Sequence, residues 1–134
     1  MPKLVLIRGL PGSGKSTIAQ AFCYNPDWIH LEADMFWMQG GEYQFDASRL
    51  REAHEWCQAE TRNNLLQDVD VVVSNTFTTV KELRPYFDIA RDFGIVPNVF
   101  IAQNEFGNVH NVPAETLAKM RARFAWDISE LFKE

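Results

Sequence analysis

Cysteine is scarce in this sequence, and no hydrophobic run is long enough to cross a membrane. Cys23 and Cys57 are the only cysteines, and neither has the spacing of a zinc site or a redox pair. Isolated thiols argue against a disulfide-stabilised secreted domain and favour a reducing compartment, so we expect a cytoplasmic protein without a metal cluster. The apolar segment at residues 3–8 is too short for a signal peptide or a transmembrane helix, so no membrane partner is expected.

Positive charge is also lacking. The net charge is −5, which is the wrong sign for a protein that holds nucleic acid through its overall electrostatic field. A nucleic-acid end held by a local group of arginines stays open. Repeats, low-complexity tracts and Ser/Gly linkers are absent as well, so nothing marks a domain boundary.

What the sequence does contain is enough apolar material for a folded core. It has 134 residues, of which 46% are hydrophobic, with ten Phe, four Trp and three Tyr. A chain of this length is typical of one domain, so we expect residues 1–134 to form a single domain. The sequence carries no signal of an oligomeric state.

Four short apolar segments alternate with helical patterns, which predicts an α/β domain with a parallel sheet of four strands, or five. Continuous apolar runs are expected where helices cover both faces of such a sheet, giving three α/β/α layers. Pro97 lies within the last segment and lacks the N–H that a central strand donates, so we expect that strand at an edge. The predicted strands are residues 3–8, 28–33, 69–74 and 95–102.

Helices are predicted between and after these strands, at about residues 15–23 and 47–67, from Thr79 to before Gly94, and from Pro113 nearly to the C-terminus. Thr79 and Glu82 have the spacing of a capping box. Pro85 follows one turn later, so that helix should be short or restart there. The segment at about residues 103–112 has no helical period and is expected to form a short lid.

Residues 9–16 match G-x-x-x-x-G-K-[ST] at every fixed position. Gly9, Gly12 and Gly14 permit a tight loop whose N–H groups converge on phosphate oxygens, and the helix N-terminus adds partial positive charge. In a P-loop, Lys15 reaches the β- and γ-phosphates and the Ser16 hydroxyl binds Mg²⁺. The sequence therefore predicts a P-loop NTPase fold that binds ATP and Mg²⁺, with the metal on Ser16. The predicted nucleotide-binding residues are Gly9, Pro11, Gly12, Ser13, Gly14, Lys15, Ser16 and Thr17.

Phosphoryl transfer also needs a group that positions the attacking hydroxyl, commonly a carboxylate. Asp34 directly follows the second strand, at the carboxyl edge where ligands bind to parallel sheets. Glu32, two residues earlier, is the rival, and a turn or N-cap role for Asp34 stays open. Asn75 ends the third strand beside the P-loop, where it either orients a phosphate, water or acceptor group or serves only as a turn residue.

Arginines are the second group to consider, because they stabilise transferring phosphoryl groups from a lid or the helix behind it. Arg121 and Arg123 lie in the last predicted helix, and a solvated helix face is the alternative for both. Arg8, before the loop, either supports the site or pairs with a structural carboxylate. His110 lies in the lid segment, where it contacts nucleotide or fixes the loop. The aromatic residues Phe36, Trp37, Phe45 and Trp56 indicate packing, with a base-stacking role open for one of them.

Over nearly its whole length the chain resembles the polynucleotide-kinase-like group of P-loop kinases. The resemblance implies transfer of the ATP γ-phosphate to a hydroxyl, with Asp34 as general base and Arg123 as a charge-stabilising or structural arginine. In two places the chain departs from that pattern: Trp37 stands where the phage kinase has an arginine, and residues 105–107 lack the arginine common in the lid. The motifs that carry the resemblance are residues 8–16, 34–36, 53–56, 74–77, 84–86, 108–113 and 120–123.

We therefore expect an ATP-dependent kinase with a catalytic set of Lys15, Asp34 and Arg123. Its hydroxyl acceptor is an oligonucleotide 5′-end or a small molecule. A small-molecule or nucleoside kinase is the first alternative, favoured by the acidic balance and short length. The second is a nucleotide-dependent binding module with weak ATPase activity, favoured by the missing lid arginine.

Overall fold

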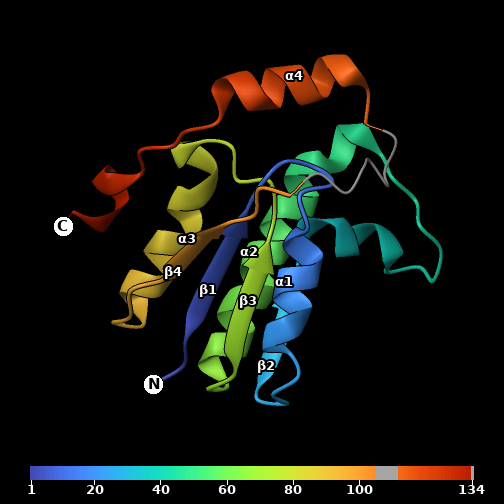
Figure 1. The fold of residues 1–134 in the computed structure, drawn as a ribbon. Coiled ribbons are helices and arrows are strands. Elements are labelled where there is room, and N and C mark those ends of the chain that lie inside the picture. The colour runs from blue at the N-terminus through green and yellow to red at the C-terminus, as the bar shows by residue number, and fades with distance from the viewer. Residues whose placement is uncertain (105–111, 134) are drawn as a thin grey trace.

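A parallel β-sheet lies at the centre of the molecule (Figure 1). The computed structural model describes residues 1–104 and 112–133. Within these residues the sheet has four strands, in the order β2-β3-β1-β4, and every pairing is parallel. The strands are β1 (Leu4–Arg8), β2 (Trp28–Leu31), β3 (Asp70–Ser74) and β4 (Asn98–Ile101).

Helices cover both faces of this sheet, because successive side chains of a strand point to opposite sides. Val5 and Ile7 of β1 pack on the side of α1 (Lys15–Phe22). Leu4 and Leu6 pack into the larger core, which α2 (Leu50–Leu66) and α3 (Val80–Asp92) cover. The predicted α/β class, with a four-stranded parallel sheet between helical layers, is confirmed.

The strand β4 lies at one edge of the sheet, where β1 is its hydrogen-bonding neighbour. Pro97 directly precedes it, so the proline takes no ladder position that needs an N–H. The predicted edge position of this strand is confirmed.

The helix α3 is continuous through Pro85, and the expectation of a short or restarted helix is wrong. Thr79 caps the helix as predicted: its hydroxyl accepts the Glu82 N–H at 3.3 Å, and a Glu82 carboxylate oxygen accepts the Thr79 N–H at 3.0 Å. Pro85 removes one backbone hydrogen bond early in the helix. Burial of Leu83, Tyr86 and other apolar residues against the sheet offsets that loss.

The last helix, α4 (Ala114–Arg123), ends well before the C-terminus, so the predicted length of this helix is wrong. Phe124 has extended backbone angles, and its ring packs 4.1 Å from the guanidinium carbon of Arg8. The next N–H, of Ala125, donates to the Thr78 carbonyl at 2.7 Å. These contacts, with Arg8 at the end of β1 and with the loop after β3, take the place of further helical turns. A short 3₁₀ helix, Ser129–Phe132, follows.

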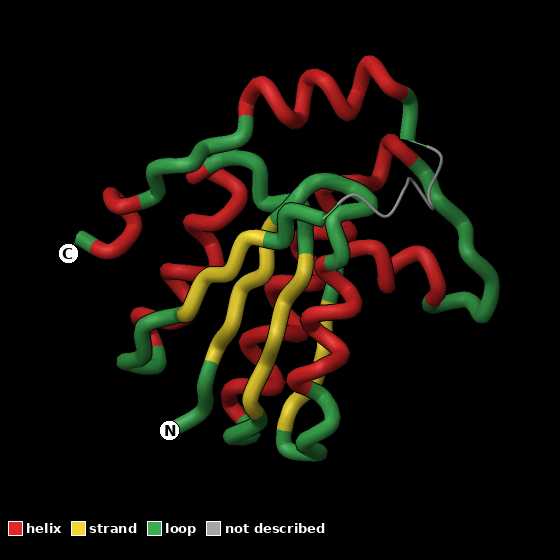
Figure 2. The backbone as a smooth tube through the Cα atoms, viewed as in Figure 1, coloured by secondary structure: helices red, strands yellow, loops and turns green. Residues whose placement is uncertain are grey.

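The loops that follow the strands gather at one edge of the sheet, above which α4 passes (Figure 2). Most of the expected lid lies outside the described residues, and the single-domain organisation stays a prediction. In the part of the chain that is described, no helix has the length and apolar character needed to cross a membrane.

Candidate functional site

The P-loop connects β1 to α1 at the carboxyl edge of the sheet. Gly12 and Gly14 have φ angles of 81° and 93°, a region that residues with a Cβ rarely adopt. A Cβ on Gly9 would lie 2.5 Å from Ser13 Oγ and 2.6 Å from the Ala102 carbonyl oxygen. The loop closes this tightly only because glycine stands at these positions.

The residues of this loop fit a bound polyphosphate. Ser13 is buried, and its Oγ has no hydrogen-bond partner among the described residues. The N–H groups of Lys15, Ser16 and Thr17 lie in the first turn of α1, where an α-helix provides no acceptor for them. These donors and the partial positive charge of the helix N-terminus suit phosphate oxygens.

The ammonium group of Lys15 lies against the loop itself and donates to the Leu10 carbonyl at 2.9 Å. Burial lowers the pKa of Lys15 to about 8, and the nearby Glu32 carboxylate opposes part of that effect. A partly desolvated ammonium held in this way is suited to exchange its carbonyl partner for a phosphate oxygen.

A cluster of polar side chains extends from Ser16 across the ends of β2 and β3. Ser16 Oγ donates to Glu32 Oε2 at 3.2 Å, and Ser74 Oγ donates to the same oxygen at 3.0 Å. His30 Nε2 lies 2.6 Å from Ser74 Oγ and 3.6 Å from Glu32 Oε2. Burial lowers the pKa of His30, against a smaller raising effect of Glu32. The strand pattern had placed Glu32 on the side of Asp34, but it gave no signal of the contact with Ser16.

Asp34 lies in a 3₁₀ helix, η1 (Ala33–Met38), two residues beyond Glu32. Its Oδ1 accepts a hydrogen bond from the Tyr43 hydroxyl at 2.9 Å. Partial burial and the hydrogen bond to Asp34 raise the pKa of Tyr43 to about 12, so the phenol stays a donor at neutral pH. The segment that holds Asp34 is therefore connected to the P-loop through Glu32. Tyr43 contacts this segment, although no sequence motif pointed to that residue.

The residues after β3 support both the P-loop and η1. The Gly9 N–H donates to the Thr76 carbonyl at 3.2 Å, and Asn75 Oδ1 accepts the Ala33 N–H at 2.9 Å. Asn75 is nearly buried. Its contacts support the structural reading of this residue, and its role toward a ligand stays a prediction.

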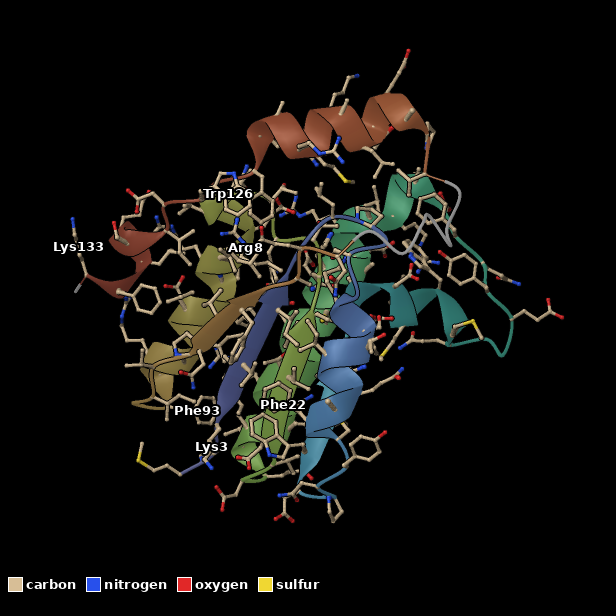
Figure 3. The ribbon with its side chains drawn as sticks, viewed as in Figure 1. Lys3, Arg8, Phe22, Phe93, Trp126 and Lys133 are labelled. Atoms are coloured by element: carbon tan, nitrogen blue, oxygen red, sulfur yellow. The ribbon has the colours of Figure 1, made fainter. Side chains whose placement is uncertain are left out.

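The three candidate arginines occupy different places. Arg8 is fully buried, and its Nε donates to the Phe77 carbonyl at 3.0 Å. Figure 3 shows Arg8 beneath Trp126, near the end of α4. Burial lowers the pKa of Arg8, against a raising effect of Glu82. Arg123 Nε donates to Thr78 Oγ1 at 3.0 Å, so this guanidinium is bound to the loop after β3.

Arg121 instead lines a pocket of about 330 Å³ between the P-loop and α4. Leu10 and Pro11 form the P-loop side of the pocket, Asn104 lies after β4, and Trp126 lies beyond α4. The four aromatic residues singled out in the sequence pack elsewhere: Phe36 lies 5.2 Å from Trp37 and 6.2 Å from Trp56, measured between ring centroids. His110 lies outside the described residues.

The family follows from a comparison with protein-family models. A model described as an AAA domain matches residues 4–104, which include the P-loop, Asp34 and all four strands. The chain belongs to the AAA domain family.

Two curated relatives of this AAA domain share substantial identity with it. Human NEDD4-binding protein 2 is 38% identical over 90 residues, which are 66% of this chain and 5% of the relative. An uncharacterized protein of Pasteurella multocida is 32% identical over 135 residues, which are 90% of this chain and 75% of the relative. The chain thus spans only a small part of the human relative.

Solved structures resemble this AAA domain in fold. A chain of the Pnkp1/Rnl/Hen1 RNA repair complex has a TM-score of 0.64 at 21% identity, with 89% of this chain and 36% of that one covered. The APS kinase CysC of Mycobacterium tuberculosis has a TM-score of 0.60 at 17% identity, with 99% and 98% covered. The AAA domain therefore has the fold of a P-loop kinase, and the resemblance to polynucleotide-kinase-like P-loop kinases is confirmed for family and fold.

Proposed function

We propose that this protein is an ATP-dependent kinase that transfers the γ-phosphate to a hydroxyl group. The observation that carries the proposal is the hydrogen bond of 3.2 Å from Ser16 to Glu32, which joins the P-loop to the segment that holds Asp34. This contact supports a site in which the phosphate-binding loop and the carboxylate of Asp34 act on the same phosphoryl group.

Each residue of this edge has a role in the proposal. The P-loop amides and Lys15 would bind the ATP phosphates, and Ser16 would hold Mg²⁺, whose charge would offset that of the phosphate oxygens. Asp34 accepts the proton of the attacking hydroxyl. The hydrogen bond from Tyr43 holds one oxygen of Asp34 and leaves the carboxylate fixed in orientation.

The positive charge beside the transferring group comes from α4. The hydrogen bond of Arg123 to Thr78 supports its structural role, whereas its catalytic role stays a prediction. Arg121 lines the pocket next to the P-loop, and we assign the charge-stabilising role to it.

The acceptor class is a 5′-hydroxyl of an oligonucleotide in our first proposal. The sequence motifs resemble polynucleotide kinases, and one structural neighbour is a chain of an RNA repair complex. A small-molecule acceptor is the second candidate, favoured by the net charge of −5 and by the nearly complete mutual coverage with an APS kinase. A cytosolic location belongs to both proposals.

The test is incubation with ATP radiolabelled in the γ-phosphate, Mg²⁺ and a panel of acceptors: 5′-hydroxyl DNA and RNA, nucleosides and sugars. Label on one class identifies the acceptor. Release of inorganic phosphate without a labelled acceptor in any class would contradict the kinase proposal and leave a nucleotide-dependent binding module.

Asp34→Asn tests the proposed base. We expect a fall in turnover of about 10²- to 10⁴-fold, because proton transfer to a positioned carboxylate contributes that much, with ATP affinity nearly unchanged. Asp88→Asn, an exposed aspartate of α3, is the matched control. Normal turnover of Asp34→Asn would refute the assignment of Asp34.

A further inference from the structure

The carboxylate in contact with the Ser16 hydroxyl of the P-loop lies directly after β2, the strand at the far edge of the sheet. Glu32 follows β2 directly, and its Oε2 accepts the Ser16 hydroxyl at 3.2 Å. Between β2 and the P-loop strand β1 lies β3. The Glu32 side chain therefore reaches past the end of β3 to the first turn of α1.

The end of β3 offers no carboxylate of its own. In P-loop NTPases Mg²⁺ is held by the P-loop hydroxyl and by an aspartate that ends a neighbouring strand. Here the neighbouring strand β3 ends in Ser74, whose partner on β1 is Ile7, and Asn75 follows. Asn75 is occupied with the Ala33 N–H and provides no negative charge.

Ser74 instead fixes the carboxylate that arrives from β2. Its hydroxyl donates to Glu32 Oε2 at 3.0 Å, and His30 lies 2.6 Å from the same hydroxyl. The oxygen that accepts the Ser16 proton is thus held from a second side. An oriented acceptor for the Ser16 proton leaves the lone pairs of Ser16 Oγ free for a cation.

We propose that Glu32 supplies, from β2, the negative charge that positions Mg²⁺ on Ser16, in place of a carboxylate at the end of β3. This inference rests on the proposed function, since it concerns the metal bound with ATP. Glu32 acts through Ser16 and is a positioning residue. Asp34, two residues later, keeps its separate role toward the acceptor.

The experiment separates metal binding from nucleotide binding. The full chain is titrated with a non-hydrolysable ATP analogue in EDTA by calorimetry, and then with Mn²⁺ in the presence of the analogue, with bound Mn²⁺ followed by electron paramagnetic resonance. Glu32→Gln should weaken Mn²⁺ binding by about 10- to 100-fold, as expected for loss of a group that orients a metal ligand. Its affinity for the analogue in EDTA should stay within about twofold of the unchanged protein, since 0.4 kcal/mol or less is then lost.

A relocated carboxylate gives the sharper readout. Glu32→Ser should lose Mn²⁺ affinity as Glu32→Gln does, and addition of Ser74→Asp should restore most of it, because the charge then stands at the end of β3. A merely structural role of Glu32 would not predict this rescue. Glu55→Gln on α2, an exposed glutamate paired with Arg51, is the matched control and should change nothing.

Two results overturn the inference in distinguishable ways. If the unchanged protein binds the analogue and Mn²⁺, and Glu32→Gln binds Mn²⁺ equally well, Glu32 has no part in the metal site, while the proposed function stands. If the unchanged protein binds no ATP analogue, the proposed function fails and this inference fails with it. Circular dichroism shows whether Glu32→Gln folds, and Glu32→Asp replaces it if it does not. In that case the inference is overturned if Glu32→Ser/Ser74→Asp binds Mn²⁺ no more tightly than Glu32→Ser does.

Discussion

The buried position of the Lys15 ammonium group costs stability. Burial lowers its pKa to about 8, compared with about 10.4 for a lysine in an unfolded chain. The unfolded state therefore binds more protons between these two values, and stability should rise with pH in that window. Replacement by a neutral side chain of similar length removes the cost of burying the charge.

We expect Lys15→Met to abolish binding of ATP with Mg²⁺ and to stabilise the metal-free, nucleotide-free protein at pH 7 by on the order of 1 kcal/mol. The gain should shrink as the pH rises through about 8 to 10, because Lys15 is then neutral in the folded protein. Urea denaturation at pH 7 and at pH 9.5 measures both effects. A variant that is less stable at pH 7 would contradict this account of the lysine.

At the same scale, a single motif can indicate site residues only where they are adjacent along the chain. The P-loop is contiguous, so its glycines, Lys15 and Ser16 could be recognised without a structure. The contact of Glu32 with Ser16 and that of Arg123 with Thr78 join residues from different elements, and only strand order and side-chain rotamers decide them. Tyr43, in a segment without a motif, was unpredictable for the same reason.

A capping box closes the N-terminus of α3, the helix that is continuous through Pro85. The Thr79 hydroxyl accepts the Glu82 N–H, and the Glu82 carboxylate accepts the Thr79 N–H. Thr79→Ala should lower the free energy of unfolding by about 1 kcal/mol, as measured for other N-cap hydroxyls. Thr79→Ser keeps the hydroxyl and should lose far less. Equal stability of the two variants in urea denaturation would show that packing alone holds this helix.

Elements were predicted well where local signals and packing agree, and poorly where a tertiary contact prevails. The strands and the start of α3 follow from apolar runs and a cap that the sequence displays. The end of α4 does not, because Phe124 leaves the helix to cover the guanidinium of Arg8, a residue more than a hundred positions earlier. The helix propensity of the residues after Arg123 gives no information about that contact, so the end of α4 could not be predicted from it.

For the whole molecule, the alternation of apolar segments and helices was sufficient to predict a parallel α/β sheet. Two parts of the strand order were predicted: β3 lies beside β1, and β4 lies at an edge, as expected from Pro97. The full order was not predicted. The identity of the acceptor is harder still to predict from the sequence, since it depends on charges distributed over the surface. The net charge of −5 is the one global quantity that bears on it.

That charge makes a prediction if the acceptor is an oligonucleotide. A negatively charged protein repels the distant phosphates of a polyanion, so only the terminus should be held, through one or two phosphate contacts near α4. Each phosphate contact with single-stranded nucleic acid contributes about −0.7 to the slope of log affinity against log salt concentration. With one or two contacts, the slope should be no steeper than about −1.4. Lengthening the oligonucleotide should likewise leave KM unchanged.

Steady-state kinetics with oligonucleotides of increasing length at several salt concentrations measure both quantities, with a nucleoside acceptor as the salt-insensitive control. A slope steeper than about −3, or a KM that falls steadily with length, would mean that the surface binds nucleic acid along an extended path that the net charge argues against.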